Sequence, residues 1–486
     1  MSHHVGSSAH SFVTPAQMDL GHELAGLRMR ARPDMGNRSI SEEEIRINIH
    51  PAGTLARKNY ILKLCKALMR YGAPTHRLEE YLDMSAHILE IEACFQYSPG
   101  CMMVTFQDRS AHTSEVEYVK TDQGVHLEKL EDAHTIYEDI LNDKISVEEG
   151  TARLEDIFAR GSNFNEWRMV PMYGLASMTV APFAFHARFI DLPYCFLLGC
   201  LVRLLQLVAP ENGYTDIGAT LITCFIARAL GSMRHEGGEI FCHSAIAQSS
   251  IALILPGFKL LMAAQEFEKK HPAVGADRLA GTGWYLLKIW YAITLGTGLY
   301  GMMDKNATSS TICHQPMPKS YYYLFVPAFA ICLQIISHAK LRQMTSMTII
   351  AFIGWLVVSH STKYIHNDQV SSALGAMTIG IVANLHARFG VQIRNWTFGY
   401  GLAAVTMLPG IFLLVPGGLS IQGPFVSGLA IGDGVYNSVH GQRLLVSIAQ
   451  DVAFQVLAIV LGISMGLSVA ASIVWPRGIR SGVFTL

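Results

Sequence analysis

Two Pro-Gly pairs that interrupt apolar stretches are the residues of this chain with the clearest chemical potential. Pro256-Gly257 and Pro416-Gly417 each follow a run of aliphatic residues, and the two pairs lie 160 positions apart. Proline has no amide proton and cannot complete the helical hydrogen bond to the residue four positions earlier, so these prolines free the carbonyls of Ala252 and Phe412. We therefore expect each stretch to be a broken helix with open backbone groups.

A third pair, Pro409-Gly410, precedes the second break and frees the carbonyl of Val405. Broken helices at corresponding places in two halves of a membrane chain are typical of transporter binding sites. Freed carbonyls can accept hydrogen bonds from the ammonium of an amino acid, and the N-terminus of the following half-helix favours its carboxylate. The alternative is an ordinary kink at each proline, whose backbone groups are satisfied by neighbouring helices.

Asp451 is a carboxylate inside the last apolar stretch, and Gln455 shares its helical face at the i,i+4 position. A lone carboxylate in lipid costs several kcal/mol unless it is paired or protonated. We predict that Asp451 carries a coupling proton. The competing interpretation is a structural ion pair between Asp451 and either Arg203 or Arg228.

Arg228 could clamp a substrate carboxylate with two hydrogen bonds, and Gln248 precedes the first break on the same stretch. We expect both to face the binding site. His243, Asn384, Arg203 and Gln455 are candidates for a supporting shell of polar residues. The alternative for all of these residues is a structural role in helix packing or at the membrane interface.

The elements that must position these residues follow from the composition of the chain. Of its 486 residues, half are hydrophobic and 15% are charged, whereas a soluble protein has roughly 25% charged residues. The first 166 residues hold 43 of the charged residues and the remaining 320 hold 32. The change near Trp167 therefore predicts a soluble part followed by a membrane part.

The membrane part is expected to be an α-helical polytopic bundle, because ten apolar stretches are long enough to cross a hydrocarbon core about 30 Å thick. Five stretches lie in each half, which predicts two five-helix repeats, inverted because an odd number of spans turns the second copy over. The predicted domains are a disordered arm (1–55), a soluble α+β domain (56–166), a first repeat (167–305) and a second repeat with a short C-terminal tail (306–486). The predicted spans are 167–186, 190–209, 215–233, 240–262, 281–302, 320–338, 343–361, 369–387, 396–419 and 444–475.

The distribution of Lys and Arg in the loops favours an orientation with both chain ends in the cytoplasm, by nine residues against six. The sequence does not distinguish the plasma membrane from an endomembrane. The nine cysteines form no CxxC pair and have no histidine at zinc spacing, so we predict buried thiols, no metal and no cofactor. Nothing in the charge pattern indicates a nucleic-acid partner, and an oligomer is left open.

In the soluble domain we expect a helix from Arg57 that ends at Gly72, a second helix from about Thr75, four short strands and two further helices. The second of these opens with the capping box Ser146-x-x-Glu149. The remaining predicted elements are strands at 93–97, 101–107, 115–120 and 125–127 and helices at 131–142 and 147–159.

The stretch 64–79, LCKALMRYGAPTHRLE, and the later stretch 125–130, VHLEKL, resemble the soluble domain of the ThrE threonine/serine exporter family. Together with the two five-span halves, the resemblance runs from about Arg57 to Ala471 and is strongest to the fungal pheromone-regulated membrane proteins of that family. It implies a secondary exporter of threonine and serine.

We therefore predict a transporter of small amino acids driven by a proton gradient across the bilayer. The alternative is a membrane-anchored hydrolase or signalling protein in which the soluble domain performs the activity and the spans form a scaffold. Repeated, broken spans favour the transporter, because an anchor needs neither feature.

Overall fold

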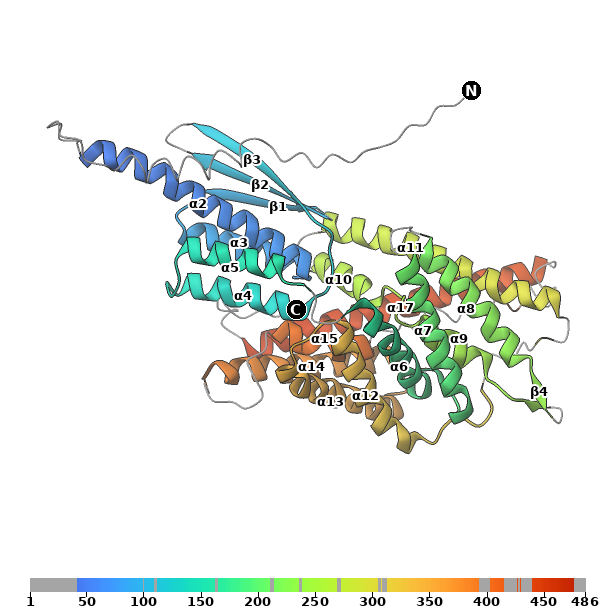
Figure 1. Ribbon diagram of the computed structural model, residues 1–486. Coiled ribbons are helices and arrows are strands. Elements are labelled where there is room, and N and C mark those ends of the chain that lie inside the picture. The colour runs from blue at the N-terminus through green and yellow to red at the C-terminus, as the bar shows by residue number, and fades with distance from the viewer. Residues whose placement is uncertain are drawn as a thin grey trace, which may run out of the picture. The chain divides into compact units, whose positions relative to one another are not determined.

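The computed structural model describes most of the chain, and it is mainly helical (Figure 1). The predicted break at Pro416-Gly417 lies outside the described residues. So do most of the predicted N-terminal arm and the connection before the last helix. The described residues are 42–98, 100–108, 112–161, 165–209, 214–235, 238–268, 272–304, 307, 313–392, 403–414, 426, 429 and 439–475.

The N-terminal domain is an α+β unit, as predicted. Its helix α2 begins at Glu42, so the last part of the predicted disordered arm is helical. Gly72 ends this helix with φ +95°, and a side chain there would meet the Gly124 carbonyl oxygen at 2.7 Å, so only glycine fits. The elements are α2 (Glu42–Tyr71), α3 (Thr75–Ile88), β1 (Ala93–Ser98), β2 (Cys101–Asp108), β3 (Thr113–Lys120), α4 (Leu127–Leu141) and α5 (Val147–Ala159).

The three strands form an antiparallel sheet in the order β1-β2-β3 (Figure 1). Alternation along β1 turns Phe95 and Tyr97 inward, where they join a core with Tyr60, Leu64 and other residues of α2. The outer strand β3 is exposed along nearly its whole length, as an edge strand that packs against no second layer would be.

Two details of this domain bear on the sequence predictions. The predicted strand at 125–127 is wrong, because His126 caps α4 and Leu127 is the first residue of that helix. The side-chain hydroxyl of Ser146 accepts a hydrogen bond from the Glu149 amide at 3.2 Å, which confirms the predicted N-terminal cap of α5.

Helices continue through the rest of the chain, and each of the ten predicted spans corresponds to a helix or to a helix with a break. The helices are α6 (Glu166–Phe185), α7 (Leu192–Val208), α8 (Thr215–Gly231), α9 (His243–Ile251), α10 (Gly257–Glu268), α11 (Pro272–Met303), α12 (Tyr322–Ile336), α13 (Leu341–Ile365), α14 (Asp368–Gln392), α15 (Ala403–Leu414) and α17 (Val439–Val474). Short pieces connect them: η1 (Phe189–Asp191), β4 (Arg234–His235), β5 (Gly238–Glu239) and η2 (Lys319–Tyr321).

Within the described residues, five helical segments are long and apolar enough to cross a membrane. The predicted number of ten spans in inverted repeats is therefore not established by helix length and composition. The five segments are Phe189–Val208, Lys319–Ile336, Leu341–Ile365, Asp368–Arg388 and Gln450–Val474.

Glycines allow some of these helices to pack backbone against backbone. A Cβ atom on Gly199 of α7 would lie 3.0 Å from the Tyr173 carbonyl oxygen of α6. A Cβ atom on Gly296 of α11 would lie 2.4 Å from the Leu221 carbonyl oxygen of α8, closer than such atoms approach. Close contacts between small residues are the usual means of helix association in membranes.

A disulfide between Cys242 and Cys313 corrects the prediction that all cysteines are buried thiols. The two residues come from separate connections, 71 positions apart, so their spacing gave no sign of the pairing. Asp191, which is fully buried and paired with Arg188, accepts a hydrogen bond from the Cys242 amide at 2.9 Å. These contacts hold together the connections that precede α7, α9 and α12.

The N-terminal domain contacts the other end of α12. The amides of Leu127 and Glu128 donate to the carbonyls of Ser337 and His338 at 3.1 and 3.0 Å. Because α12 has 15 residues at about 1.5 Å each, these contacts lie roughly 22 Å from the first residue of the helix. Cys313 of the disulfide lies in the connection before that residue.

Candidate functional site

The helical stretch around Pro256-Gly257, on which the predicted site depends, is broken at the place that the sequence indicates. Helix α9 ends at Ile251, α10 begins at Gly257, and the residues between them form turns. The Ile254 amide donates to the Ile251 carbonyl at 3.0 Å, and the Leu260 amide donates to the Pro256 carbonyl at 3.2 Å. Pro256 has no proton to donate to the Ala252 carbonyl, which explains why the helix stops and restarts here.

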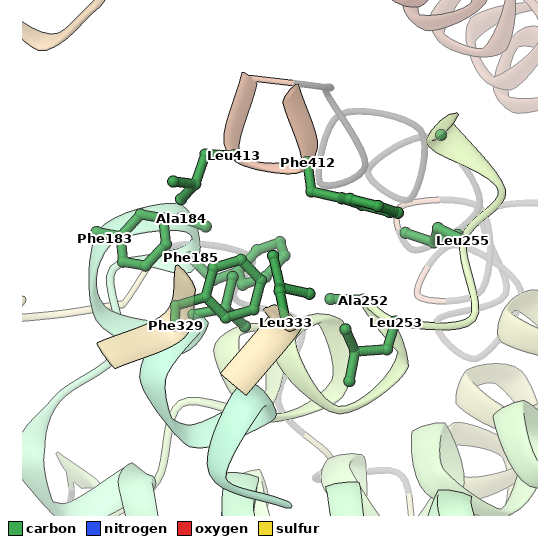
Figure 2. Close-up of a pocket in the computed structure, with 12 residues that line it drawn as sticks. Phe183, Ala184, Phe185, Ala252, Leu253, Leu255, Phe329, Leu333, Phe412 and Leu413 are labelled. Carbon is green, nitrogen blue, oxygen red and sulfur yellow. The ribbon is translucent and has the colours of Figure 1, made fainter. Parts of the chain in front are cut away.

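A cavity of about 110 Å³ lies at this break. Its lining comes from four places in the chain: the end of α6, the break with the start of α10, the middle of α12 and the end of α15 (Figure 2). The volume corresponds to a few water molecules or one small solute. The lining residues are Val180, Phe183, Ala184, Phe185, Ala252, Leu253, Leu255, Gly257, Phe329, Leu333, Phe412 and Leu413.

The cavity brings together residues that the sequence places 160 positions apart. Ala252 and Phe412, whose carbonyls the two prolines are expected to free, both line it (Figure 2). The rings of Phe258 and Phe412 stack with their centroids 5.5 Å apart. The segment that leads into the second predicted break therefore lies against the first break, although Pro416 and Gly417 themselves lie outside the described residues.

The prediction of a further break at Pro409-Gly410 is wrong, because α15 runs without interruption from Ala403 to Leu414. Both residues are buried, and a Cβ atom on Gly410 would lie 2.9 Å from a side-chain carbon of Ile379 on α14. Surrounding helices can support a helix across a proline. Gly410 thus serves close helix packing and does not line the cavity.

Several of the predicted polar site residues pack between helices and are not among the lining residues. Gln248 is buried and donates to the Ser244 hydroxyl at 2.9 Å on its own helix. Arg228, which is fully buried, donates to the Thr297 carbonyl at 2.8 Å and so links α8 to α11. His243 is buried directly against Gly231, where a Cβ atom would lie 2.4 Å from the His243 Cβ.

The other predicted residues are distributed over the bundle. Asn384 is buried and donates to the Gly380 carbonyl at 2.8 Å within α14. Arg203 pairs with Glu166 and lies 4.9 Å from the centroid of the Tyr173 ring. Asp451 and Gln455 are exposed on the surface of α17, in the first turns of its apolar segment. The proton role of Asp451 stays a prediction.

A polar chain that sequence reasoning missed reaches the break from the other side. The Asp216 carboxylate in the first turn of α8 accepts hydrogen bonds from Gln206 Nε2 and from the Tyr285 hydroxyl, both at 2.7 Å. The Tyr285 hydroxyl oxygen also lies 3.4 Å from the Ile254 carbonyl oxygen in the break. In the sequence, Asp216 looks like an ordinary acidic residue in the first turn of a helix. No sequence pattern connects it with Ile254.

The far end of the broken helix contacts the N-terminal domain. Glu266 on α10 is fully buried and pairs with Arg278 of α11 at 3.0 Å, and Arg278 also donates to the Tyr97 hydroxyl of β1 at 3.1 Å. Cavity helices α10 and α12 therefore both end on the N-terminal domain.

Ionisable groups at the α12 contact have shifted pKa values. Burial, together with the neighbouring His338 and Lys129, lowers the pKa of His126 to about 4, and its ring stacks on that of His338 with the centroids 4.6 Å apart. Burial raises the pKa of Glu131 above its ordinary value, against the opposing effect of Lys340, whose Nζ lies 3.3 Å from the carboxylate. Gln343 donates a further hydrogen bond to Glu131 at 2.7 Å.

Three charged residues of α3, a helix of the domain in which the alternative hydrolase activity would lie, make structural contacts. Arg77 is buried and pairs with Glu80 at 2.5 Å, and Glu79 accepts a hydrogen bond from the Tyr97 amide at 3.1 Å. Across the ranges that the structure describes, no group of three or more His, Cys, Asp or Glu side chains could hold a metal ion.

Together, the apolar helices and the cavity at a broken helix define a polytopic helical membrane protein with a small internal cavity. Two family models match the chain: ThrE, described as "Putative threonine/serine exporter", at residues 59–300, and ThrE_2, described as "Threonine/Serine exporter, ThrE", at residues 322–473. The chain belongs to the ThrE family. This confirms the family predicted from the N-terminal motifs.

Among curated proteins, an uncharacterised protein of Schizosaccharomyces pombe is 39% identical over 455 residues, which cover 91% of this chain and 59% of the relative. Pheromone-regulated membrane protein 10 of Candida albicans is 38% identical and that of Yarrowia lipolytica 36%, each over 91% of this chain and 40% and 39% of the relative. The chain thus spans well under two thirds of the length of these relatives. No solved structure matches it.

Proposed function

We propose that this protein is a secondary transporter that moves small hydroxy amino acids, threonine and serine, across a membrane with proton coupling. The observation that carries the proposal is the cavity between the break before Pro256 and the end of α15. The descriptions of the two ThrE family models support threonine and serine as the proposed substrates.

The chemistry of the cavity suits a small zwitterion. Its side-chain lining is aliphatic and aromatic, so its polar groups are those of the backbone at the break. The carbonyl that Pro256 leaves without a helical donor can accept a hydrogen bond from an ammonium, and the N-terminus of α10 favours a carboxylate. The volume of the whole cavity, about 110 Å³, favours an amino acid with a small side chain.

The position of the lining helices supports the predicted duplication. Helices α6 and α12 are the first of each predicted five-helix half, and the α9–α10 pair and α15 are the fourth. Equivalent helices from both halves would meet at one site in a pair of inverted repeats, whose halves move against each other during transport.

The proposed orientation, with the N-terminal domain in the cytoplasm, is supported by the Cys242–Cys313 disulfide. Disulfides persist on the oxidising side of a membrane and are rare in the cytosol. Cys313 lies in the connection that precedes α12, whereas the N-terminal domain contacts the end of that helix.

The test is transport of labelled threonine and serine by the full chain in reconstituted vesicles. Ala252→Leu and Ala184→Leu each place a branched side chain in the cavity and should lower flux at least tenfold. Ala280→Leu, at an exposed position of α11, is the matched control and should transport normally. Absence of threonine and serine flux in the unaltered protein, or full flux in both cavity variants, would refute the proposal.

A further inference from the structure

The Asp216 carboxylate and the helix break share one tyrosine hydroxyl. Tyr285 of α11 lies 2.7 Å from Asp216 Oδ2 and 3.4 Å from the Ile254 carbonyl oxygen. A phenol has a single proton to donate. Tyr285 can therefore donate to the carboxylate or to the backbone at the break, but not to both at full strength.

In the structure the Tyr285 hydroxyl donates mainly to the carboxylate and only weakly to the break. A bond of 2.7 Å between the hydroxyl and Asp216 is in the range of charge-assisted hydrogen bonds, whereas 3.4 Å to Ile254 is long. Gln206 holds the other carboxylate oxygen at 2.7 Å, and the first turn of α8 favours a negative charge. In this state the Ile254 carbonyl is only weakly bound by Tyr285.

We propose that Asp216 is the proton-binding carboxylate of the transporter and that Tyr285 transmits its protonation to the helix break; this inference rests on the proposed function. A proton bound at Asp216 Oδ2 becomes the donor in the bond to the Tyr285 oxygen. The tyrosine then turns its own proton towards the Ile254 carbonyl. One proton is gained, the hydrogen bond between Asp216 and Tyr285 reverses its direction, the bond from Tyr285 to the Ile254 carbonyl strengthens, and no bond between heavy atoms is made or broken.

Protonation of Asp216 would affect the cavity because of the position of Ile254. Its neighbours Leu253 and Leu255 both line the cavity (Figure 2). Ile254 itself is held by a single turn hydrogen bond, from its amide to the Ile251 carbonyl at 3.0 Å, and not by a regular helix. A carbonyl drawn towards Tyr285 would therefore move two lining residues without unwinding a helix.

Other ionisable groups surround Asp216 and Tyr285, and among them Asp216 is the group that we propose to gain and lose the proton. Tyr173 of α6 lies within electrostatic range of Asp216, and Arg203 of α7 is engaged with Glu166 and the Tyr173 ring. Lys288 of α11 lies 6.0 Å from the centroid of the Tyr285 ring, one turn along the same helix. Both cations therefore contact tyrosine rings, those of Tyr173 and Tyr285.

Asp451 differs from Asp216 in each of these respects. It is exposed on α17, and no hydrogen bond of the described residues joins it to the break. The two carboxylates therefore make opposite predictions for the same experiment.

The experiment compares two assays in vesicles that contain the full chain. Counterflow, the exchange of labelled for unlabelled threonine at equal pH, reports substrate movement without a gradient. Accumulation driven by an imposed pH gradient reports coupling. Asp216→Asn keeps the shape of the carboxylate, and Tyr285→Phe keeps the ring and removes only the hydroxyl.

In both variants the pH-driven accumulation should fall at least tenfold, and the exchange that remains should no longer depend on pH. Tyr291→Phe, at a position of the same helix that is 66% exposed, should retain accumulation, and so should Asp451→Asn. Retention of pH-driven accumulation by Asp216→Asn, or its loss only in Asp451→Asn, would overturn the inference. Accumulation by the unaltered protein that follows a sodium gradient and not pH would do the same. Failure of the unaltered protein in counterflow with threonine and with serine would instead overturn the proposed function.

Discussion

Removal of the Cys242–Cys313 disulfide should lower the stability of the protein without preventing its folding. The bond closes a segment of 71 residues, for which the loss of chain entropy in the unfolded state amounts to about 4 kcal/mol. The helices within that segment are already restrained by the membrane, so we expect an observed loss of about 2 kcal/mol. The folded state should persist because Asp191 still binds the Cys242 amide and Arg188.

The assay is thermal unfolding of the purified protein in detergent. Cys242→Ser, Cys313→Ser and the double variant should share one lowered midpoint, and a reductant should bring the unaltered protein to the same value. Cys94→Ser, which removes an exposed free thiol, is the matched control and should have no effect. Equal midpoints for the double variant and the unaltered protein would refute the reasoning.

The same two cysteines can be used to determine the orientation of the protein in the membrane. After mild reduction of sealed cells, a membrane-impermeant thiol reagent should label Cys242 and Cys313 from outside if the N-terminal domain is cytoplasmic. For protein that has reached the plasma membrane, labelling of both only after permeabilisation would place the disulfide on the cytosolic side and contradict the proposed orientation.

Three further predictions concern packing, the domain contact and pH. Gly296→Ala should destabilise the protein by about 1–3 kcal/mol, because its Cβ would lie 2.4 Å from the Leu221 carbonyl oxygen; Gly281→Ala, with open space on the same helix, is the control for the thermal midpoint. Lys340→Ala removes ion pairs to Glu131 and Asp132 and should speed hydrogen exchange in α4 by an amount that corresponds to about 1–2 kcal/mol, whereas Lys363→Ala, at an exposed site, should not. Burial lowers the pKa of His134 to about 4, as it does for His126, against an ordinary value of 6.5. The unfolded chain therefore binds more protons than the folded one between these values, so stability should be constant above pH 6.5 and fall towards pH 4, with a weaker fall in His134→Gln.

The N-terminal domain shows what local sequence patterns can predict. The helical period from Arg57, the stop at Gly72 and the cap at Ser146 all depend on neighbouring residues, and the structure confirms them. The prediction of a strand at 125–127 failed because the short apolar pattern there suits a strand. The start of α4 is instead fixed by contacts with Ser337 and His338, more than 200 residues away. Tertiary contacts of this kind leave no local period in the sequence.

The prediction that polar residues face the cavity failed for a related reason. A polar residue in an apolar stretch indicates a role, but it does not show which side of its helix faces a cavity. Arg228 and Asn384 each donate a hydrogen bond to a carbonyl within the bundle, whereas Asp216, at the edge of its stretch, reaches the break through Tyr285. That connection joins residues from three separate helices and the break, so no spacing rule could have revealed it.

Pro256 and Pro409 have the same chemistry and opposite outcomes. Each lacks an amide proton and each is followed by glycine, but α15 continues through Pro409, while the helix stops before Pro256. Gly410 lies tightly against α13 and α14, whose side chains hold that helix in shape on both sides. The break before Pro256 faces a cavity on one side and the Tyr285 hydroxyl on the other. A proline therefore predicts where a membrane helix can open, and the packing of its neighbours decides whether it does. Close packing around Gly410 supports a continuous helix, whereas the cavity beside the break before Pro256 leaves room for an open one.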